Sequence, residues 1–319
     1  MVLIDQRRLP GEVSLIKLKD LDEMAEAISS LAVRGAPAIG AFGGLALSFL
    51  IDGGKGPDEC YDVLVKTRPT AVDLKHVLDR VLGGYDKGGP DEARRISDDI
   101  VSGTVESCRR IGEAGTEVIG DGSRVMTHCN AGALATLDWG TALAPVRMVH
   151  RGGGDIFVWV SETRPLLQGS RLTAWELLQE GIPHKIFVDS ASGYLMKNGE
   201  VDTLITGADR VCVNGDTANK IGTFEKALLA REFGIPFYVA IPWSTFDPEL
   251  KSGEGIPIEV RDGSELTKLD KTVLAPDGSE CVNPAFDVTP AEYITGFITP
   301  DGIFTPEELE AAWRLHRIV

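Results

Sequence analysis

The first third of the chain carries its apolar residues at the three- and four-residue spacing of amphipathic helices. This pattern predicts helices over residues 20–31 and 36–50, and two looser helical segments near 58–84 and 91–119. Gly-Gly and Asp-Gly pairs separate these segments, and no alternating run between 13 and 120 predicts a strand. We therefore expect residues 1–120 to form a mostly helical N-terminal domain.

The pattern changes near residue 122, where short runs rich in Val, Ile and Phe alternate with helical stretches. Five such runs predict buried parallel strands, at 124–127, 156–160, 185–188, 203–206 and 237–241. Alternation of strands and helices is typical of an open, mostly parallel sheet covered by helices on both faces. The expected fold class is α/β, with a Rossmann-like domain over residues 121–319 following the helical one.

Reactive and hydrogen-bonding side chains follow each predicted strand. In chain order the strand ends meet 127–132 (THCNAG), 161–165 (SETRP), 189–190 (DS), 207–210 (GADR) and 244–247 (STFD). Ligands of open parallel sheets bind in the crevice beyond the carboxyl ends of the strands. Loops are polar in any protein, but that does not account for Cys129, a Glu-Arg pair and Asp209 all falling at strand ends.

A glycine-bearing turn in the helical part has the features of an anion site. Residues 33–40 (VRGAPAIG) place Pro37 at the start of the next predicted helix, where free amide groups attract negative charge. Arg34 adds a full positive charge, and Arg68 is a second arginine beside a chain break at Pro69. Such turns and single arginines are common in proteins. They therefore support an anion site only in combination with the polar residues at the strand ends.

Composition and charge exclude several classes of partner. The formal net charge is −16, which repels nucleic-acid phosphates, whereas a small anion can still be held by local arginines. No apolar run is long enough to span a membrane, and residues 1–10 contain no apolar leader segment. We expect a cytoplasmic protein with a small-molecule ligand and with no nucleic-acid or membrane partner.

Cysteine and histidine usage argues against a metal or a disulfide framework. The five cysteines are odd in number, form no C-x-x-C pair, and are Cys60, Cys108, Cys129, Cys212 and Cys281. The five histidines are scattered, and no G-x-G-x-x-G or Walker motif follows the first strand, so no metal or organic cofactor is implied. A buried cysteine is usually inert packing, and only Cys129 lies at a strand end. His128 precedes it, but neighbours in a strand point to opposite faces, so we expect no Cys-His pair.

Taken together, these segments resemble the methylthioribose-1-phosphate isomerase family of methionine salvage. The resemblance covers nearly the whole chain and is carried by VRGAPAIG (33–40), RPTAV (68–72), THCNAGALAT (127–136), ETRPLLQGSRLTAWEL (162–177), GADRVCVNGDTANKIG (207–222) and NPAFDVTPAEYITG (283–296). The family is similar to ribose-1,5-bisphosphate isomerase and to regulatory subunits of a translation-initiation exchange factor, which are not isomerases. The combination of Gln168 in LLQGSRLTAWEL with RGAPAIG favours the methylthioribose branch, and Cys129 together with Asp209 favours an enzyme over a regulatory subunit.

The resemblance implies roles for particular residues. It places the family's catalytic cysteine at Cys129 and its catalytic aspartate at Asp209. The substrate-binding positions that it implies are Arg34, Gly35, Ala36, Arg68, Gln168, Asn219 and Lys220. It also implies a homodimer that pairs through the sheet-bearing, catalytic domain.

The family reaction converts a cyclic aldose 1-phosphate into an open-chain ketose 1-phosphate. Our hypothesis is that Asp209 donates a proton to the ring oxygen while Cys129 handles the hydrogen on the carbon next to the anomeric one, by a phosphoenolate or a hydride shift. Donation requires a raised pKa, so we expect Asp209 to lie away from Arg34, Arg68 and Lys220. The alternatives are an isomerase for 5-deoxyribose 1-phosphate or ribose 1,5-bisphosphate, and a regulatory subunit without turnover.

Overall fold

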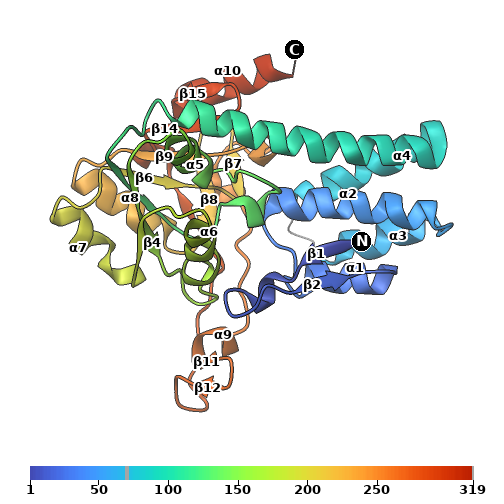
Figure 1. The fold of residues 1–319 in the computed structure, drawn as a ribbon, viewed down its shortest axis with the longest axis horizontal. Coiled ribbons are helices and arrows are strands. Elements are labelled where there is room, and N and C mark those ends of the chain that lie inside the picture. The colour runs from blue at the N-terminus through green and yellow to red at the C-terminus, as the bar shows by residue number, and fades with distance from the viewer. Residues whose placement is uncertain (69–71, 318–319) are drawn as a thin grey trace.

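The computed structural model describes residues 1–68 and 72–317, so residues 69–71 of the RPTAV motif lie outside the described part of the chain (Figure 1). A helical region comes first and a sheet-bearing region follows. The predicted α/β class, with a mostly helical beginning and a mainly parallel sheet, is confirmed.

The helical region packs around one central helix. Its helices are α1 (Leu21–Ser29), α2 (Ala36–Asp52), α3 (Pro57–Lys66) and α4 (Val72–Gly115). α2 is apolar on most of its surface and almost wholly buried, with α4 along its side. α4 bends at Gly89, whose φ is 71°, directly before Pro90, which is why the sequence pattern divides there.

The sequence pattern missed a short hairpin at the start of this region. β1 (Val2–Ile4) pairs with β2 (Leu15–Lys17) in an antiparallel ladder. Each strand has three residues, too few to show an alternating pattern.

The main sheet contains all five predicted strands. Its order is β15-β14-β9-β6-β3-β4-β5. The bounds are β3 (Ser123–Thr127), β4 (Ile156–Ser161), β5 (His184–Phe187), β6 (Thr203–Thr206), β9 (Phe237–Ala240), β14 (Gly296–Thr299) and β15 (Gly302–Phe304). β14 extends the parallel part beside β9, and β15 closes that edge in the antiparallel sense. These two strands were not predicted.

Successive strand residues point to opposite faces of the sheet, and each face has its own core. On β3, Val125 packs into one cluster and Met126 into the other; on β6, Ile205 and Leu204 divide in the same way. The Val125 side is covered by the end of α4 together with α5 (Leu143–Arg151) and α6 (Ala174–Gln179). The Met126 side is covered by α7 (Ser192–Lys197), α8 (Thr223–Glu232) and α10 (Pro306–His316).

The strand order reverses between β3 and β6. From β3 the chain proceeds through β4 to β5 on one side, and from β6 it proceeds through β9 to β14 on the other. The crevice at such a reversal is where open α/β sheets bind ligands. Cys129 follows β3 and Asp209 follows β6, so the topology brings the two predicted residues to the same crevice.

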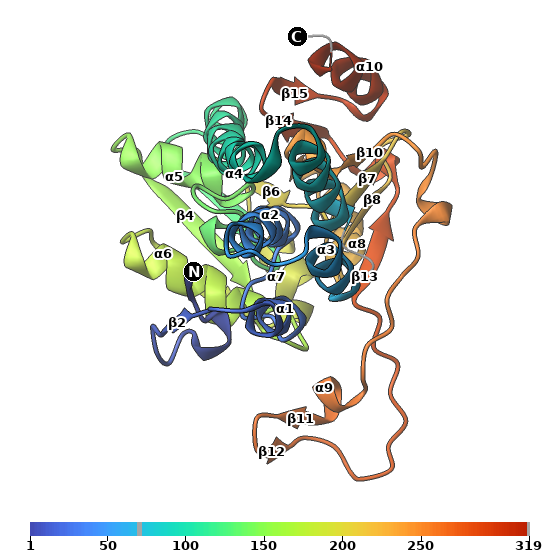
Figure 2. The same ribbon diagram turned by 90° about the vertical axis from the view of Figure 1, so that its right-hand side faces the viewer.

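A second, smaller sheet and a projecting arm complete the fold. The sheet has the order β10-β7-β8-β13, with bounds β7 (Arg210–Cys212), β8 (Thr217–Lys220), β10 (Phe246–Asp247) and β13 (Phe286–Thr289). Between β10 and β13 the chain leaves the body as an arm that carries α9 (Ser264–Thr267), β11 (Lys268–Leu269) and β12 (Thr272–Val273) (Figure 2). None of these short strands was predicted.

The division into two domains at residue 120 stays a prediction. α4 ends at Gly115, and Ile111 and Ile119 pack into the core of the sheet. Within the described residues, no helix is both long and apolar enough to cross a membrane.

Candidate active site

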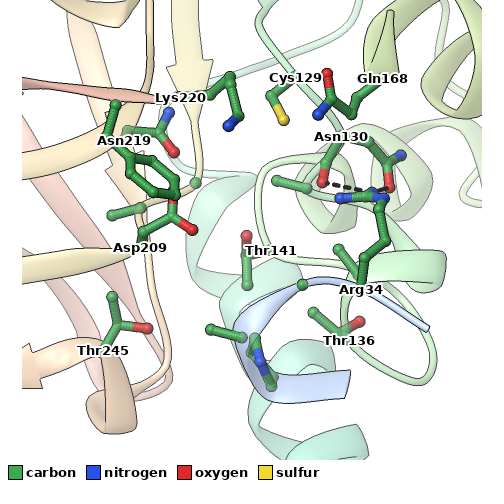
Figure 3. Close-up of a pocket in the computed structure, with 18 of the residues that line it drawn as sticks. Arg34, Cys129, Asn130, Thr136, Thr141, Gln168, Asp209, Asn219, Lys220 and Thr245 are labelled. Carbon is green, nitrogen blue, oxygen red and sulfur yellow. Dashed lines mark hydrogen bonds between the residues drawn. The ribbon is translucent and has the colours of Figure 1, made fainter. Parts of the chain in front are cut away.

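All nine predicted site residues line one pocket at the reversal of strand order. The pocket is bounded by the beginning of α2, the segments after β3 and β6, and the base of the arm. Asp209, Asn219 and Lys220 form one wall, and they face Cys129, Gln168 and Arg34 on the other (Figure 3). The remaining predicted residues, Gly35, Ala36 and Arg68, also belong to the lining.

Cys129 is held in an unusual backbone conformation. Its φ is +64°, in the left-handed region, and that of Thr163 in the neighbouring loop is +66°. A β-branched residue at positive φ is a true outlier, and such strain concentrates at functional sites. The two loops support each other, because the Cys129 amide donates to Thr163 Oγ1 at 2.9 Å while Thr173 Oγ1 donates to the Cys129 carbonyl at 2.7 Å.

Electrostatics keep the Cys129 thiol protonated near neutral pH. Burial raises the pKa of Cys129 above its ordinary value, and Arg34 and Lys220 only partly oppose that rise. The side chain is partly open to the pocket. It therefore presents a thiol, rather than a thiolate, to a bound ligand.

Asp209 also has a raised pKa, although our expectation about its surroundings was wrong. Burial raises the pKa of the Asp209 carboxyl group, while the positive charges of Lys220, Arg68 and Arg34 lower it. We expected these cations to lie away from Asp209, but all three are close enough to act on it. Desolvation outweighs these positive charges, so the pKa of Asp209 is still raised, as a proton donor requires.

Among the described residues, the neighbouring Arg210 forms its ion pair with a carboxylate other than Asp209. Arg210 pairs instead with Asp247, at 3.7 Å between Nη1 and Oδ2. The Asp209 amide donates to the Ala218 carbonyl at 2.9 Å. The carboxyl group is surrounded by protein, which desolvates it, and its accessible surface faces the pocket that a ligand would fill.

A second carboxyl group titrates in the field of Asp209. Asp73, in the first turn of α4, is 7% exposed, and its Oδ2 has no hydrogen-bond partner among residues 1–68 and 72–317. Burial raises the pKa of Asp73 to about 7, a hydrogen bond from Ser244 lowers it, and the charge of Asp209 raises it further. Asp73 and Asp209 are therefore two neighbouring carboxyl groups whose pKa values are both raised.

The beginning of α2 supplies the predicted anion subsite. Gly35 is the N-cap with a φ of 90°, and Ala36 and Pro37 form the first turn of the helix, whose free amide groups carry partial positive charge. Arg34 Nη2 donates to the Asn130 carbonyl at 3.2 Å and to Asn130 Oδ1. The Arg34 Nε group is buried and has no partner in the described part of the chain, which leaves a charged donor for a ligand to satisfy.

Substitution of Gly35 by alanine is expected to destabilise the protein by about 3 kcal/mol or more. An added Cβ would lie 2.5 Å from the Ala135 Cα and still closer to the Ala135 carbonyl oxygen, so the Cys129 loop and α2 would have to separate. Urea unfolding followed by circular dichroism measures the free energy of unfolding.

Gly54, just beyond the other end of α2, provides the matched control. Its φ is +80°, and an added Cβ would meet nothing within 4 Å. Gly54→Ala therefore carries only the backbone strain, about 1–2 kcal/mol. Equal losses in the two variants would show that the close approach at Gly35 has no importance.

Two amide side chains and a lysine complete the predicted set. Gln168 is 8% exposed, and its buried Oε1 has no partner among the residues that the structure describes. Asn219 Nδ2 donates to Thr223 Oγ1 at 3.0 Å, and Lys220 Nζ donates to the Ala285 carbonyl at 2.9 Å and lies 4.3 Å from the Phe286 ring. The unsatisfied Gln168 oxygen is an acceptor suited to a ligand hydroxyl group.

Sequence reasoning missed part of the lining. These residues are Asn130, Thr136, Thr141, Thr245, Glu259, Arg261 and Phe286. Asn130 and Thr136 lie within the quoted THCNAGALAT motif, and Phe286 within NPAFDVTPAEYITG, so those motifs held a signal. Glu259 and Arg261 come from the base of the arm, where no pattern in the sequence pointed to the pocket.

The ends of β4 and β5 support the site instead of lining it. Asp189, after β5, accepts from Ser161 Oγ at 2.5 Å, from the Thr163 amide at 2.8 Å and from the Arg164 amide at 2.7 Å. This carboxylate holds the loop that contacts the Cys129 amide. The Glu-Arg pair at 162 and 164 thus belongs to a supporting loop.

His128 forms no hydrogen bond with Cys129, as expected. Its Nε2 lies 2.8 Å from the Ile221 carbonyl and its Nδ1 lies 3.4 Å from Thr163 Oγ1. Burial, together with the charge of Lys226, lowers the pKa of His128 to about 3, so the ring is neutral. In the part of the chain that the structure describes, no group of three or more His, Cys, Asp or Glu is arranged to hold a metal ion.

This arrangement is suited to proton and hydrogen transfer on an anionic ligand. A carboxyl group with a raised pKa and a protonated thiol face each other across the pocket, and a helix N-terminus with an under-satisfied arginine belongs to its lining. Such a set can hold a phosphate and exchange hydrogens on the carbon and oxygen atoms beside it.

Comparison with known proteins gives a consistent result. Residues 58–306 match the model of the Initiation factor 2 subunit family. The chain is 49% identical over 314 residues to a protein of Aquifex aeolicus named methylthioribose-1-phosphate isomerase, covering 98% of this chain and 68% of that one.

Two solved structures are similar over nearly the whole chain. The 5-methylthioribose 1-phosphate isomerase of Pyrococcus horikoshii OT3 superposes with a TM-score of 0.93 at 40% identity, covering 100% of this chain and 93% of that one. A structure described as the translation initiation factor eIF-2B, subunit delta, from A. fulgidus gives a TM-score of 0.88 at 40% identity, covering 98% of this chain and 96% of that one.

Proposed function

The chain belongs to the Initiation factor 2 subunit family and, within it, to the methylthioribose-1-phosphate isomerases, and we propose that Cys129 and Asp209 carry out its reaction. The protein is an aldose-ketose isomerase that converts 5-methylthioribose 1-phosphate to 5-methylthioribulose 1-phosphate, a step of methionine salvage. The observation that supports the two residues most strongly is their position across one pocket at the reversal of strand order, on adjacent strands β3 and β6.

The reaction moves three hydrogens and breaks one carbon–oxygen bond. Asp209 gives its proton to the ring oxygen as the bond from that oxygen to C1 breaks. The hydrogen on C2 is transferred to C1. As the C2 carbonyl forms, the C2 hydroxyl proton passes to the Cys129 sulfur, and the thiol gives its own proton to the Asp209 carboxylate. The overall change is an isomerisation that needs no external oxidant. At its end, Asp209 and Cys129 have the same protonation states as at the start.

The phosphate is proposed to bind at the beginning of α2. Free amide groups there, together with Arg34 and Arg68, provide the donors and the charge that a phosphate needs. Lys220 lies on the Asp209 wall, where its charge lowers the pKa of that carboxyl group. Gln168 and Asn219 are left to bind sugar hydroxyl groups.

A direct assay tests the function. The purified protein is incubated with 5-methylthioribose 1-phosphate, 5-deoxyribose 1-phosphate or ribose 1,5-bisphosphate, and the ketose product is followed by the carbonyl carbon signal in NMR. We expect the highest kcat/KM with the methylthio substrate. A higher value with either of the other sugars would reassign the substrate within the same reaction class.

The second candidate is a regulatory subunit that binds a sugar phosphate without turnover. The similarity to the A. fulgidus initiation factor subunit favours it. Failure to form ketose from any of the three phosphates, with phosphate binding intact, would support that role over an isomerase.

The setting of the enzyme is also part of the proposal. We propose a cytoplasmic homodimer, consistent with five free cysteines and with the resemblance stated above. Analytical ultracentrifugation of the full chain measures the oligomeric state.

A further inference from the structure

Glu176, on α6, is buried and surrounded by hydrogen-bond donors. Its side chain accepts from Asn130 Nδ2 at 2.8 Å, from the Ala133 amide at 2.7 Å, from the Leu134 amide at 3.3 Å and from Arg147 Nη2 at 2.6 Å. Glu176 is 3% exposed and does not line the pocket. Four donors around one buried carboxylate fix its neighbours as firmly as they fix the carboxylate itself.

Three of these donors belong to the segment that follows Cys129. The carboxyl group is pressed against this segment, since a Cβ added at Gly132 would lie 2.6 Å from the Glu176 Cδ. Thr173, three residues earlier on the same helical run, donates to the Cys129 carbonyl at 2.7 Å and accepts from Asn130 Nδ2 at 3.1 Å. One face of this helix therefore determines where the segment lies.

The same contacts reach Arg34 through Asn130. With its amide nitrogen bound to Glu176 and Thr173, the Asn130 side chain must present its oxygen to Arg34, and Arg34 Nη2 donates to that oxygen and to the Asn130 carbonyl. The guanidinium is thereby held with its Nε group unpaired. The relay from Glu176 through Asn130 to Arg34 connects a buried carboxylate to the anion subsite.

We propose that Glu176 is a positioning residue for the isomerisation. Through the Asn130 amide it orients the Arg34 guanidinium toward the phosphate, and through the Ala133 and Leu134 amides it holds the loop that carries Cys129. This inference rests on the proposed function in one respect, that the ligand of Arg34 is a phosphate group.

The relay predicts a change in binding that exceeds the change in turnover. Glu176→Gln replaces one acceptor oxygen by an NH2 group that faces donors, so the Asn130 amide is released or turned and Arg34 loses its orientation. We expect KM for the sugar phosphate, and Kd for inorganic phosphate, to rise about tenfold or more, with a smaller fall in kcat. Steady-state kinetics and isothermal titration calorimetry with inorganic phosphate measure the two.

Glu180 is the matched control on the same helix. It accepts from Arg147 Nε at 2.5 Å and from Arg151 Nη2 at 2.9 Å, and within the described residues its side chain forms no hydrogen bond with the Cys129 loop. Glu180→Gln therefore removes a charged partner of Arg147 without touching the relay, and we expect KM and phosphate binding to stay at wild-type values. Thermal unfolding of both variants reports the stability that each loses.

Asn130→Ala tests the relay at its middle residue and serves if Glu176→Gln does not fold. It should raise KM and the phosphate Kd in the same way, and the double variant should show less than the sum of the two effects, as expected for residues in one network. If the substitution only unfolded part of the protein, the apparent kcat would fall and KM would not change. A purely structural role therefore predicts an effect on kcat, whereas the positioning role predicts an effect mainly on KM.

The results separate this proposal from the proposed function. Unchanged KM and phosphate Kd in Glu176→Gln, or equal changes in Glu180→Gln, would overturn the positioning role even while turnover confirms the isomerase. A protein that turns over none of the three sugars, but binds phosphate more weakly in Glu176→Gln and Asn130→Ala and not in Glu180→Gln, would keep the positioning role. The same result would overturn the proposed isomerase function.

Discussion

Replacement of Cys129 by alanine is expected to lower kcat by about a thousandfold, with little change in KM. The thiol faces Asp209 across the pocket. The Cys129 backbone is held separately, by hydrogen bonds of its amide and its carbonyl to Thr163 and Thr173. The variant should therefore keep its structure and its ligand. Steady-state kinetics with the sugar phosphate measure both constants.

Cys212 provides the control for this substitution. It is fully buried in β7, just beyond Asp209, and burial raises the pKa of its thiol to about 11. It does not line the pocket, so Cys212→Ala should retain turnover with only a modest loss of stability. A comparable loss of kcat in both variants would mean that any buried cysteine in this region matters, and the chemical role of Cys129 would be rejected.

The raised pKa of Cys129 also selects between the two routes. A thiol that keeps its proton near neutral pH is a poor base, so the C2 hydrogen should pass directly to C1 as hydride. Product formed in D2O should then carry no deuterium at C1. Deuterium at C1 would instead require a thiolate that removes the C2 proton and a phosphoenolate intermediate.

The crevice was predictable because it depends on features that a sequence displays. Five buried strands are long enough to stand out as apolar runs, and their carboxyl ends must lie at one edge of a parallel sheet. The strand order itself was not visible, yet it is the reversal between β3 and β6 that places Cys129 opposite Asp209 rather than beside another strand end. Local pattern therefore placed Cys129 and Asp209 at strand ends, the resemblance implied their roles, and the topology brought the two strand ends together.

The parts that escaped prediction are those made by short or long-range pairing. β7, β8, β10 and β13 have two to four residues each, and they form a sheet only because segments far apart in the chain meet. Glu259 and Arg261 reach the pocket for the same reason, from an arm whose sequence shows no regular pattern. Glu176 was likewise hidden, since a single acidic residue on a helix gives no sign that four donors surround it.

The surroundings of Asp209 show why electrostatics could not be derived from the sequence. We expected a proton-donating Asp209 to lie away from Arg34, Arg68 and Lys220. In the structure, all three are close enough to lower its pKa. Desolvation decides the sign, and desolvation depends on packing that no motif encodes. The nearby cations then fulfil two needs, because they hold an anionic ligand and they stabilise the carboxylate formed after the proton has left.

Asp209→Asn is expected to reduce kcat by about a thousandfold while substrate binding stays largely intact. The amide keeps the shape of the carboxyl group but cannot give a proton to the ring oxygen. In the wild type, turnover should fall as pH rises through the raised pKa of Asp209, because only the protonated form donates. This fall in turnover is the alkaline limb of the pH profile. In the variant the alkaline limb should disappear, and the residual rate should not depend on pH in that range. Retained turnover would contradict the assignment.

Two further variants show which acid the alkaline limb reports. Lys220 is the strongest of the charges that lower the pKa of Asp209, so Lys220→Met should raise that pKa and move the limb to higher pH. Asp73, with a pKa of about 7, is the other acid that titrates near neutrality, but it does not line the pocket. Asp73→Asn should therefore keep both the turnover and the limb, which shifts only slightly to lower pH because one negative charge near Asp209 is gone. If instead the limb vanished in Asp73→Asn and persisted in Asp209→Asn, the proton donor would be Asp73.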